Sequence, residues 1–334
     1  MNLSSKLRLT DIGEEVGGKG VVLRVDYNVP MEKGEVQDSS RVEATLPSLE
    51  WLLQRHPRYV CILSHLGRPE GRVQQKYSLR PVAAKLEQLL GRQVTFLEEC
   101  VGEQVEQRLA QAEEGQVFLL ENVRFHLEEE GKGKDEQGQV LKATPQQTLL
   151  FREGLSRLGE VFVNDAFGTS HRAHSSIVGL TCRWRVAGLL LKRELEYFGR
   201  ALEAPERPLV VLIGGAKVSD KIKLILNIID LADHIIIGGG MAFTFLKELY
   251  GVDIGKSLYD QEGAALIPEI MSKAKGRGVK VHLPVDYVCA DLSLPGPKRK
   301  SQLLDHRTGI PPPLMGLDIG PESTAQFVEV LRLA

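Results

Sequence analysis

Short apolar runs alternate along the chain with longer stretches in which apolar residues recur at helical spacing. Most of the short runs are apolar on both faces, which is typical of parallel strands covered by helices. We predict strands at Val21–Val25, Tyr59–Leu63, Val117–Leu120, Val161–Val163, Leu209–Ile213, Ile235–Ile237 and Val279–Leu283. We predict helices at Arg41–Arg55, Ser78–Leu90, Pro145–Leu158, Ser219–Leu231 and Gly263–Lys275. This alternation predicts an α/β fold made of βαβ units.

The length of 334 residues exceeds what one hydrophobic core comfortably organises, so we expect two domains. A helix-like segment at Leu191–Glu203 precedes the proline-rich residues 204–208, which indicates a connector. We therefore predict an N-terminal lobe over residues 1–189, a connecting helix over 190–204 and a C-terminal lobe over 205–334. The charged, glycine-rich stretch Glu128–Lys142 predicts a surface loop rather than part of a site.

Composition narrows the class of protein. The net charge of −2 gives no reason to propose nucleic acid or an acidic membrane as a partner. No apolar run approaches the roughly 18 residues of a membrane span, and the polar N-terminus Met1–Arg8 lacks the apolar core of a signal peptide. The four cysteines are scattered, which argues against a disulfide framework or a zinc site. We expect a cytosolic protein.

Polar residues follow each of the first four predicted strands. In a parallel sheet these positions share the edge formed by the carboxyl ends of the strands, where ligands bind. They are Asp26, Asn28, Ser64, His65, Arg68, Asn122, Arg124, Asn164, Asp165, His171, Arg172 and His174, joined by Arg41 from the first helix. Arginine forks match carboxylate and phosphate geometry, so the pattern predicts a small ligand with several negative charges.

Two other interpretations of these residues were weighed. His171 and His174 lack a neighbouring cysteine and form no His-Glu-x-x-His motif, which disfavours a zinc site there. Asp26 and Asp165 are candidates for a general acid and base, but a structural role that holds arginines or caps loops is equally consistent with the sequence.

A glycine-rich turn, Gly214-Gly-Ala-Lys-Val-Ser-Asp-Lys221, follows the strand Leu209–Ile213. Glycines let the backbone approach a phosphate chain, and we expect Lys217 and Lys221 to share one face of the following helix. The turn does not match the common P-loop pattern, so an ordinary tight turn is the alternative.

Eight segments together resemble the phosphoglycerate kinase family, in family order across nearly the whole chain. They are Arg24–Pro30, Ser64–Pro69, Leu120–Phe125, Val163–Ser175, Gly214–Ile222, Gly238–Phe245, Pro284–Asp286 and Met315–Pro321. The loop Phe125–Asp135 resembles the eukaryotic branch. The resemblance implies two Rossmann-like lobes with parallel sheets, and reversible phosphoryl transfer between 1,3-bisphosphoglycerate with ADP and 3-phosphoglycerate with ATP, in glycolysis. It also implies a monomer.

The resemblance also implies roles for single residues. Asp26 and Asn28 would bind the glycerate end of 3-phosphoglycerate, and Arg41 would stabilise the phosphoryl group in flight. The basic patch would be His65, Arg68, Arg124, His171 and Arg172. The MgATP or MgADP site would be lined by Gly215, Ala216, Lys217, Asp220, Lys221, Gly239, Leu258 and Gly316.

The reaction places few demands on proton transfer. Its nucleophile is a carboxylate that is already ionised at about pH 7, so no catalytic base is required. Catalysis then depends on positioning and on charge stabilisation by Arg41, Lys217 and magnesium. The two lobes must close around the substrates, and we expect Leu191–Glu203 to form part of the hinge.

The sequence ends at Ala334, where family members continue through the magnesium-binding aspartate and the last strands of the C-terminal lobe. We therefore expect an incomplete C-terminal lobe without a protein ligand for the metal. This leaves an alternative, a catalytically impaired family member that only binds 3-phosphoglycerate or protein partners. A nicotinamide-dependent dehydrogenase is disfavoured, because Gly-x-Gly-x-x-Gly does not follow the first strand.

Overall fold

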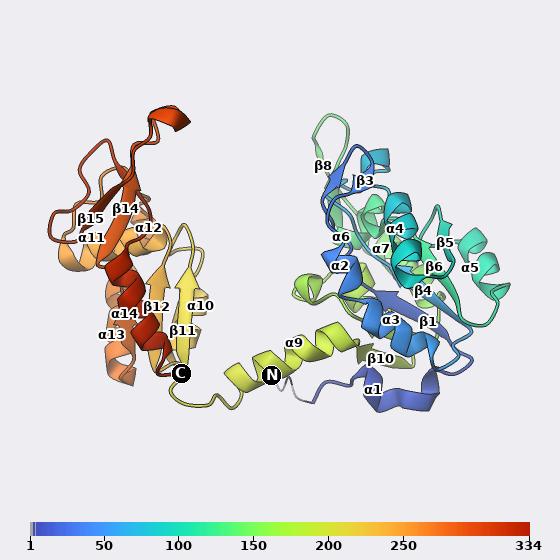
Figure 1. The fold of residues 1–334 in the computed structure, drawn as a ribbon. Helices are drawn as coiled ribbons and strands as arrows, with labels where there is room; N and C mark the ends of the chain where they lie inside the picture. The colour runs from blue at the N-terminus through green and yellow to red at the C-terminus, as the bar shows by residue number, and fades with distance from the viewer. Residues whose placement is uncertain (1–2, 4) are drawn as a thin grey trace. The chain divides into compact units, whose positions relative to one another are not determined.

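The structure, a computed structural model, describes residues 3 and 5–334. Within the N-terminal segment discussed above, Met1, Asn2 and Ser4 lie outside the described residues. The chain forms two compact units, of which unit 1 ends at Gly199 and unit 2 begins at Arg200 (Figure 1). Each unit is described by itself.

Unit 1 is built on a six-stranded parallel sheet with the strand order β10-β9-β1-β4-β6-β5. The strands are β1 (Gly20–Arg24), β4 (Tyr59–Leu63), β5 (Val94–Leu97), β6 (Gln116–Leu120), β9 (Val161–Asn164) and β10 (Trp184–Ala187). Every residue of β1 and β4 is buried, as expected for central strands that are covered on both faces. The four strands predicted in this half are confirmed to within one residue at each end.

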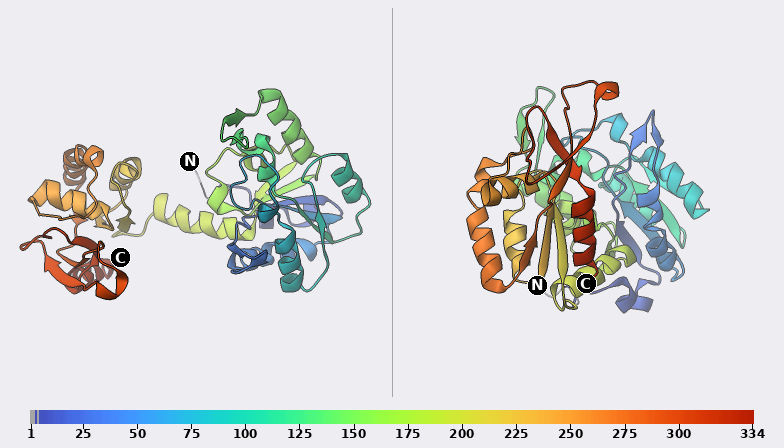
Figure 2. Two further views of the ribbon diagram at one scale, coloured as in Figure 1. Left: turned by 90° about the horizontal axis from the view of Figure 1, so that it is seen from above. Right: turned by 60° about the vertical axis from the view of Figure 1, so that its left-hand side comes forward.

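Helices cover both faces of this sheet (Figure 2). Alternate residues of β1 enter different cores: Val21 and Leu23 pack with Leu49 and Val82, whereas Val22 packs with residues that include Phe151. The helices are α1 (Leu9–Ile12), α2 (Ser40–Glu43), α3 (Leu46–Leu53), α4 (Arg80–Leu90), α5 (Glu103–Ala110), α6 (Leu127–Glu130), α7 (Pro145–Ser156), α8 (Ser175–Val178) and α9 (Leu189–Leu202).

Two predictions in this unit are wrong in detail. The helix expected at Arg41–Arg55 is divided into α2 and α3, because Pro47 lacks an N–H and favours the first turn of a new helix. The loop expected at Glu128–Lys142 contains α6 and an antiparallel hairpin, β7 (Lys132–Lys134) with β8 (Val140–Lys142). Glu129 in α6 is only 1% exposed, so this stretch is not simply a solvated surface.

A further hairpin and five 3-10 helices are short elements of the described residues. The hairpin strands β2 (Met31–Glu32) and β3 (Glu35–Val36) pair antiparallel. The 3-10 helices are η1 (Gly13–Val16), η2 (Gln75–Tyr77), η3 (Val123–Phe125), η4 (Phe167–Thr169) and η5 (Gly296–Lys298). In the described part of the chain, no helix is both long enough and apolar enough to cross a bilayer.

Unit 2 combines a parallel and an antiparallel sheet. The strands β11 (Val210–Gly214), β12 (His234–Gly238) and β13 (Lys280–His282) are parallel, as the sequence predicted. The strands β14 (Asp286–Ala290), β15 (Gln302–Asp305) and β16 (Met315–Ile319) form an antiparallel sheet that the sequence analysis did not predict. The helices are α10 (Ile222–Ile229), α11 (Met241–Tyr250), α12 (Gln261–Ala264), α13 (Ile267–Arg277) and α14 (Pro321–Leu331).

Candidate functional site

A cavity of about 490 Å³ lies at the carboxyl ends of the strands in unit 1. It gathers seven of the eight residues that were assigned to substrate binding: Asp26, Asn28, Arg41, His65, Arg68, Arg124 and Arg172. They converge because β9, β1, β4 and β6 are consecutive parallel neighbours, so the segments that leave these strands emerge at one edge. Gly67, Tyr77, Gly168 and Thr169 complete the lining, and the sequence analysis gave none of these four a role.

Asp26 organises one side of the cavity. Its Oδ2 lies 2.8 Å from Nη1 of Arg41, and its Oδ1 lies 3.8 Å from Nε2 of His65. The backbone N–H of Asn28 donates to the same Oδ1 over 3.3 Å. In the described structure Asp26 therefore holds the half-exposed Arg41 guanidinium at the cavity, which is the contact that the structural alternative for Asp26 expects.

Gly67 links two other walls of the cavity. Its N–H donates to Oδ1 of Asn28 over 2.8 Å, and its carbonyl accepts from Nη1 of Arg124 over 2.9 Å. Its φ of +62° lies in the left-handed region, and a Cβ there would come within 2.3 Å of the Tyr77 ring. Glycine is required here because both the backbone conformation and the close ring exclude a side chain.

The cavity carries an excess of positive charge. Four arginines face one carboxylate among its lining residues, and neither Arg68 nor Arg172 forms an ion pair within the described residues. Burial, reinforced by the nearby charges of Arg24 and Arg124, lowers the pKa of His65, so its imidazole stays neutral. Two uncompensated guanidinium groups in a concave site favour a ligand with several negative charges.

Beneath the cavity lies a buried layer that the sequence analysis missed. Arg24 is completely buried and donates through Nε to Oγ of Ser176 over 2.8 Å. Ser176 in turn donates to Glu129, from Oγ over 2.6 Å and from its backbone N–H over 2.8 Å. Burial lowers the pKa of Arg24, and Glu129 is the leading charge that opposes this effect. The sequence contained one signal of this layer: Arg24 is a charged residue inside an apolar strand, and a buried charged residue requires a buried partner.

Six residues predicted at the strand ends do not line the cavity: Ser64, Asn122, Asn164, Asp165, His171 and His174. The imidazole of His174 faces Glu129 at 3.8 Å and Glu130 at 3.5 Å. His171 is exposed, accepts from Nε of Arg172 over 3.4 Å and lines a separate cavity of about 640 Å³. Asp165 is buried, and its Oδ1 accepts from the N–H of Leu191 over 3.0 Å. Burial raises the pKa of Asp165 to about 6. This contact in the first turn of α9 favours the structural alternative for Asp165.

Two glycine turns approach each other in unit 2, after the neighbouring strands β11 and β12. Gly214 and Gly238 are paired in register, and the N–H of Met241 donates to the carbonyl of Gly215 over 2.8 Å. Gly239 has a φ of +65°, and a Cβ there would lie 3.0 Å from the backbone N and O of Gly215. The two turns therefore pack backbone against backbone, which leaves N–H groups close to the strand ends.

The expectation that Lys217 and Lys221 share a helix face is wrong. Helix α10 begins at Ile222, so both lysines lie in the turn before it. The Oδ2 of Asp260 accepts from the N–H of Ser219 over 2.8 Å, which holds this turn. Lys217 is exposed and forms no ion pair among residues 5–334, and Asp220 is exposed in the same turn.

The remaining predicted nucleotide residues surround these turns. A Cβ at Gly240 would lie 2.6 Å from the Leu258 side chain and 3.5 Å from the Ala216 backbone, so both residues border the second turn. Gly316 donates to Oγ of Ser257 over 2.9 Å. Together with Gly239 it lines a small cavity of about 60 Å³, which also contains Phe243 and Tyr287.

The comparisons with known proteins agree with this geometry. The family model described as phosphoglycerate kinase matches residues 9–334. The chain is 52% identical to a phosphoglycerate kinase of Sterkiella nova, over 99% of this chain and 79% of that protein. It is 50% identical to phosphoglycerate kinase 1 of Homo sapiens, over 100% of this chain and 79% of that protein. The structure of phosphoglycerate kinase from Coxiella burnetii superposes with a TM-score of 0.78 at 34% identity, covering 98% of this chain and 78% of that one.

These matches support the phosphotransferase interpretation and give no support to the alternative of a protein that only binds. They extend over both units, and the chain spans about four fifths of the length of the relatives. The chain belongs to the phosphoglycerate kinase family, whose members are phosphotransferases.

Proposed function

We propose that this chain catalyses reversible phosphoryl transfer between 1,3-bisphosphoglycerate with ADP and 3-phosphoglycerate with ATP, as a step of glycolysis. The cavity of unit 1 is the proposed acid site, and the glycine turns of unit 2 are the proposed nucleotide site. The observation that carries the proposal is the cavity lined by four arginines and one aspartate, in which Arg68 and Arg172 lack a carboxylate partner among the described residues.

In the proposed acid site, the phosphate of 3-phosphoglycerate binds to the guanidinium groups of the basic patch. Arg68 and Arg172 present charges that no protein carboxylate neutralises in the described structure, and Arg124 is held in place by Gly67. The proposed partners of the glycerate end are Asp26 and Asn28. Neutral His65 supplies a hydrogen-bonding ring, and a contact of exposed His171 stays a prediction from the family resemblance.

The proposed transfer needs no protein base. A carboxylate oxygen of 3-phosphoglycerate forms a bond to the γ-phosphorus of ATP, and the bond from that phosphorus to the β–γ bridging oxygen breaks, which releases ADP. Arg41 and Lys217 are the proposed groups that stabilise the transferring charge. We assign residues 1–189 to the acid-binding lobe, 190–204 to a hinge helix and 205–334 to the nucleotide lobe, with α9 as the element that moves.

The nucleotide site is proposed at the backbone N–H groups of Gly215, Ala216 and Gly239, with Lys217 and Lys221 on the phosphates. Asp220, Leu258 and Gly316 complete the proposed lining. Magnesium is expected as part of the nucleotide substrate. Mg²⁺ is commonly held by one or two carboxylates together with substrate phosphates, and the expectation that this chain supplies no protein ligand for it stays a prediction. We therefore derive no step through the metal.

A cytosolic location and a monomeric state are part of the same proposal. Both rest on the resemblance to the family and on the composition of the chain. Size-exclusion chromatography with light scattering tests the monomeric state, because it gives the mass in solution directly, and a dimeric mass contradicts it.

The decisive test measures ATP consumption that depends on 3-phosphoglycerate and magnesium, coupled to reduction of the acyl phosphate product. Removing one charge-assisted contact costs about 1.5–3 kcal/mol, so Arg172→Ala should raise the KM for 3-phosphoglycerate roughly 10- to 150-fold. Arg108→Ala is the matched control, because Arg108 is exposed on α5 and forms no ion pair within the described structure. A KM that is equal in both variants contradicts the proposed acid site.

A further inference from the structure

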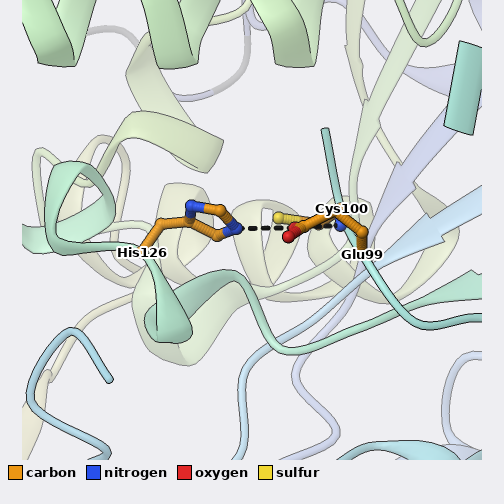
Figure 3. Close-up of side chains that lie close together, drawn as sticks. All are labelled: Glu99, Cys100 and His126. Carbon is orange, nitrogen blue, oxygen red and sulfur yellow. Dashed lines mark hydrogen bonds and ion pairs between the residues drawn. The ribbon is translucent and has the colours of Figure 1, made fainter. Parts of the chain in front are cut away.

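Three metal-ligating side chains converge outside the proposed substrate site, in unit 1 (Figure 3). Glu99 and Cys100 follow β5, and His126 lies between η3 and α6. One donor atom from each residue, a carboxylate oxygen, the thiol sulfur and an imidazole nitrogen, lies within 4.8 Å of the other two. We propose that Glu99, Cys100 and His126 form a binding site for a zinc ion.

The geometry of the three donors fits a tetrahedral ion. Zinc bonds of about 2.0–2.3 Å place neighbouring ligand atoms roughly 3–4 Å apart, and the three donor atoms here lie within 4.8 Å of one another. Nε2 of His126 already lies 2.6 Å from Oε1 of Glu99, so these two donors are side by side before any metal binds. The N–H of Cys100 donates to the same carboxylate oxygen over 2.7 Å and fixes its position.

The surroundings hold the donors in place. The ring of His126 stacks on Phe151 with a centroid distance of 4.9 Å and an interplanar angle of 30°, which limits rotation of the imidazole. Cys100 is completely buried, so its sulfur is shielded from solvent. Figure 3 shows the sulfur and the Glu99 carboxylate facing the same edge of the imidazole ring. A preorganised set of three protein ligands is the arrangement that leaves one position of zinc open.

The open position has space. Glu99 and His126 also line a cavity of about 250 Å³, which is large enough to hold water as a fourth ligand. The other carboxylates of this cavity are committed elsewhere: Glu98 pairs with Arg80, while Glu121 accepts from Ser78 over 2.7 Å and from the N–H of Leu79 over 2.9 Å. Glu99 is therefore the carboxylate that is placed to bind a metal.

The chemistry of the donors selects the ion. Sulfur and imidazole nitrogen are poor ligands for magnesium and calcium, which prefer oxygen, and good ligands for zinc. On binding, zinc replaces the proton of the Cys100 thiol, which leaves to solvent, and one thiolate with one carboxylate then balances the double charge of the ion. The sequence conceals the site because Cys100 and His126 are far apart along the chain, without the short spacing of a zinc motif.

The test uses the full chain, freed of metal and titrated with Zn²⁺ in competition with a chromophoric chelator. Co²⁺ serves as a spectroscopic probe, since a bound thiolate gives a sulfur-to-cobalt charge-transfer band. We expect one ion per chain, with affinity reduced at least ~100-fold in Cys100→Ala and in His126→Gln, because even indirect partners of a metal site contribute 10- to 100-fold. Cys182→Ser is the control, since its sulfur lies near the carbonyl of Gly159 and outside the cluster.

Two results overturn the proposal. The first is the absence of stoichiometric binding of Zn²⁺ or Co²⁺ to the wild-type chain at micromolar concentrations. The second is binding that His126→Gln leaves unchanged. Cys100 is buried, so its alanine variant risks misfolding, and in that case the His126→Gln result decides, because that side chain is 26% exposed.

Discussion

Replacing Glu129 with alanine removes the carboxylate that opposes the buried charge of Arg24. The structure places this carboxylate 2.6 Å from Oγ of Ser176 and 2.8 Å from its backbone N–H, and Ser176 connects it to Arg24. The variant loses both hydrogen bonds and leaves a guanidinium without its leading counter-charge in a fully buried position. Glu129 reaches Arg24 through Ser176, and leaving a buried charge uncompensated costs about 3–5 kcal/mol, which is several times the effect of an ordinary surface substitution.

Urea unfolding followed by tryptophan fluorescence measures this loss selectively. The chain has two tryptophans, Trp51 and Trp184, and both lie in unit 1, so the signal reports the unit that contains Glu129. With a urea dependence of about 2–3 kcal/mol per molar, the midpoint should fall by roughly 1–2.5 M. Glu128→Ala is the matched control: the same change in the same helix, at a carboxylate that forms no ion pair in the described chain.

Two results refute the reasoning. If Glu129→Ala shifts the midpoint no more than Glu128→Ala, the carboxylate does not support Arg24. If the double variant Arg24→Met with Glu129→Met is as unstable as Glu129→Ala alone, the cost comes from lost packing rather than from an orphaned charge. We expect partial recovery in the double variant, because replacing both members of a buried pair with apolar residues is often neutral.

Two further predictions concern Asp165 and Gly239. The pKa of Asp165 is raised by burial from 3.8 to about 6, so the folded chain holds that proton more tightly than the unfolded chain, and stability falls as pH rises from about 4 to 6. The loss of stability over this pH range is at most roughly 3 kcal/mol. The variant Asp165→Asn cannot titrate, so its stability in tryptophan-monitored unfolding should not show this loss. Stability that falls equally with pH in both proteins contradicts the prediction. Gly239→Ala introduces a Cβ at a φ of +65° and 3.0 Å from Gly215, so the KM for ATP should rise about tenfold or more. Gly276→Ala, in the helix α13 with open space around it, is the control, and equal KM values in the two variants would exclude strain at the glycine turn.

The strand ends of unit 1 could be predicted from the sequence, because short apolar runs that alternate with helical stretches indicate parallel strands. Apolar runs of the observed lengths locate β1, β4, β6 and β9, and the residues after them then share one edge. Asn28 and Arg124 reach that edge as expected, but their common contact with Gly67 could not be read from the sequence. This common contact depends on the conformation of a turn, and several residue types are compatible with the positions before that turn.

The errors have physical causes of a different kind. Glu129 stands in a run of three glutamates that resembles a solvated face, and only packing against α8 shows that the middle one is buried. Lys217 and Lys221 have helical spacing, but they lie in a turn before α10, and Asp260, about 40 residues later, holds that turn through Ser219. In both cases a contact distant in sequence overrides a local pattern.

The contacts of Gly67 have a consequence for how this protein can vary. The backbone of one residue joins Asn28 to Arg124, so two walls of the cavity share a single support. A substitution at Gly67 would disturb both walls together, and changes at Asn28 or Arg124 would be felt across the cavity. We expect change to be slow at all three positions because each one affects this support, whereas a change at Arg68, exposed at the rim, would alter ligand binding without disturbing the support. Selection for a new anionic ligand would therefore begin at the rim and reach the Gly67 support last.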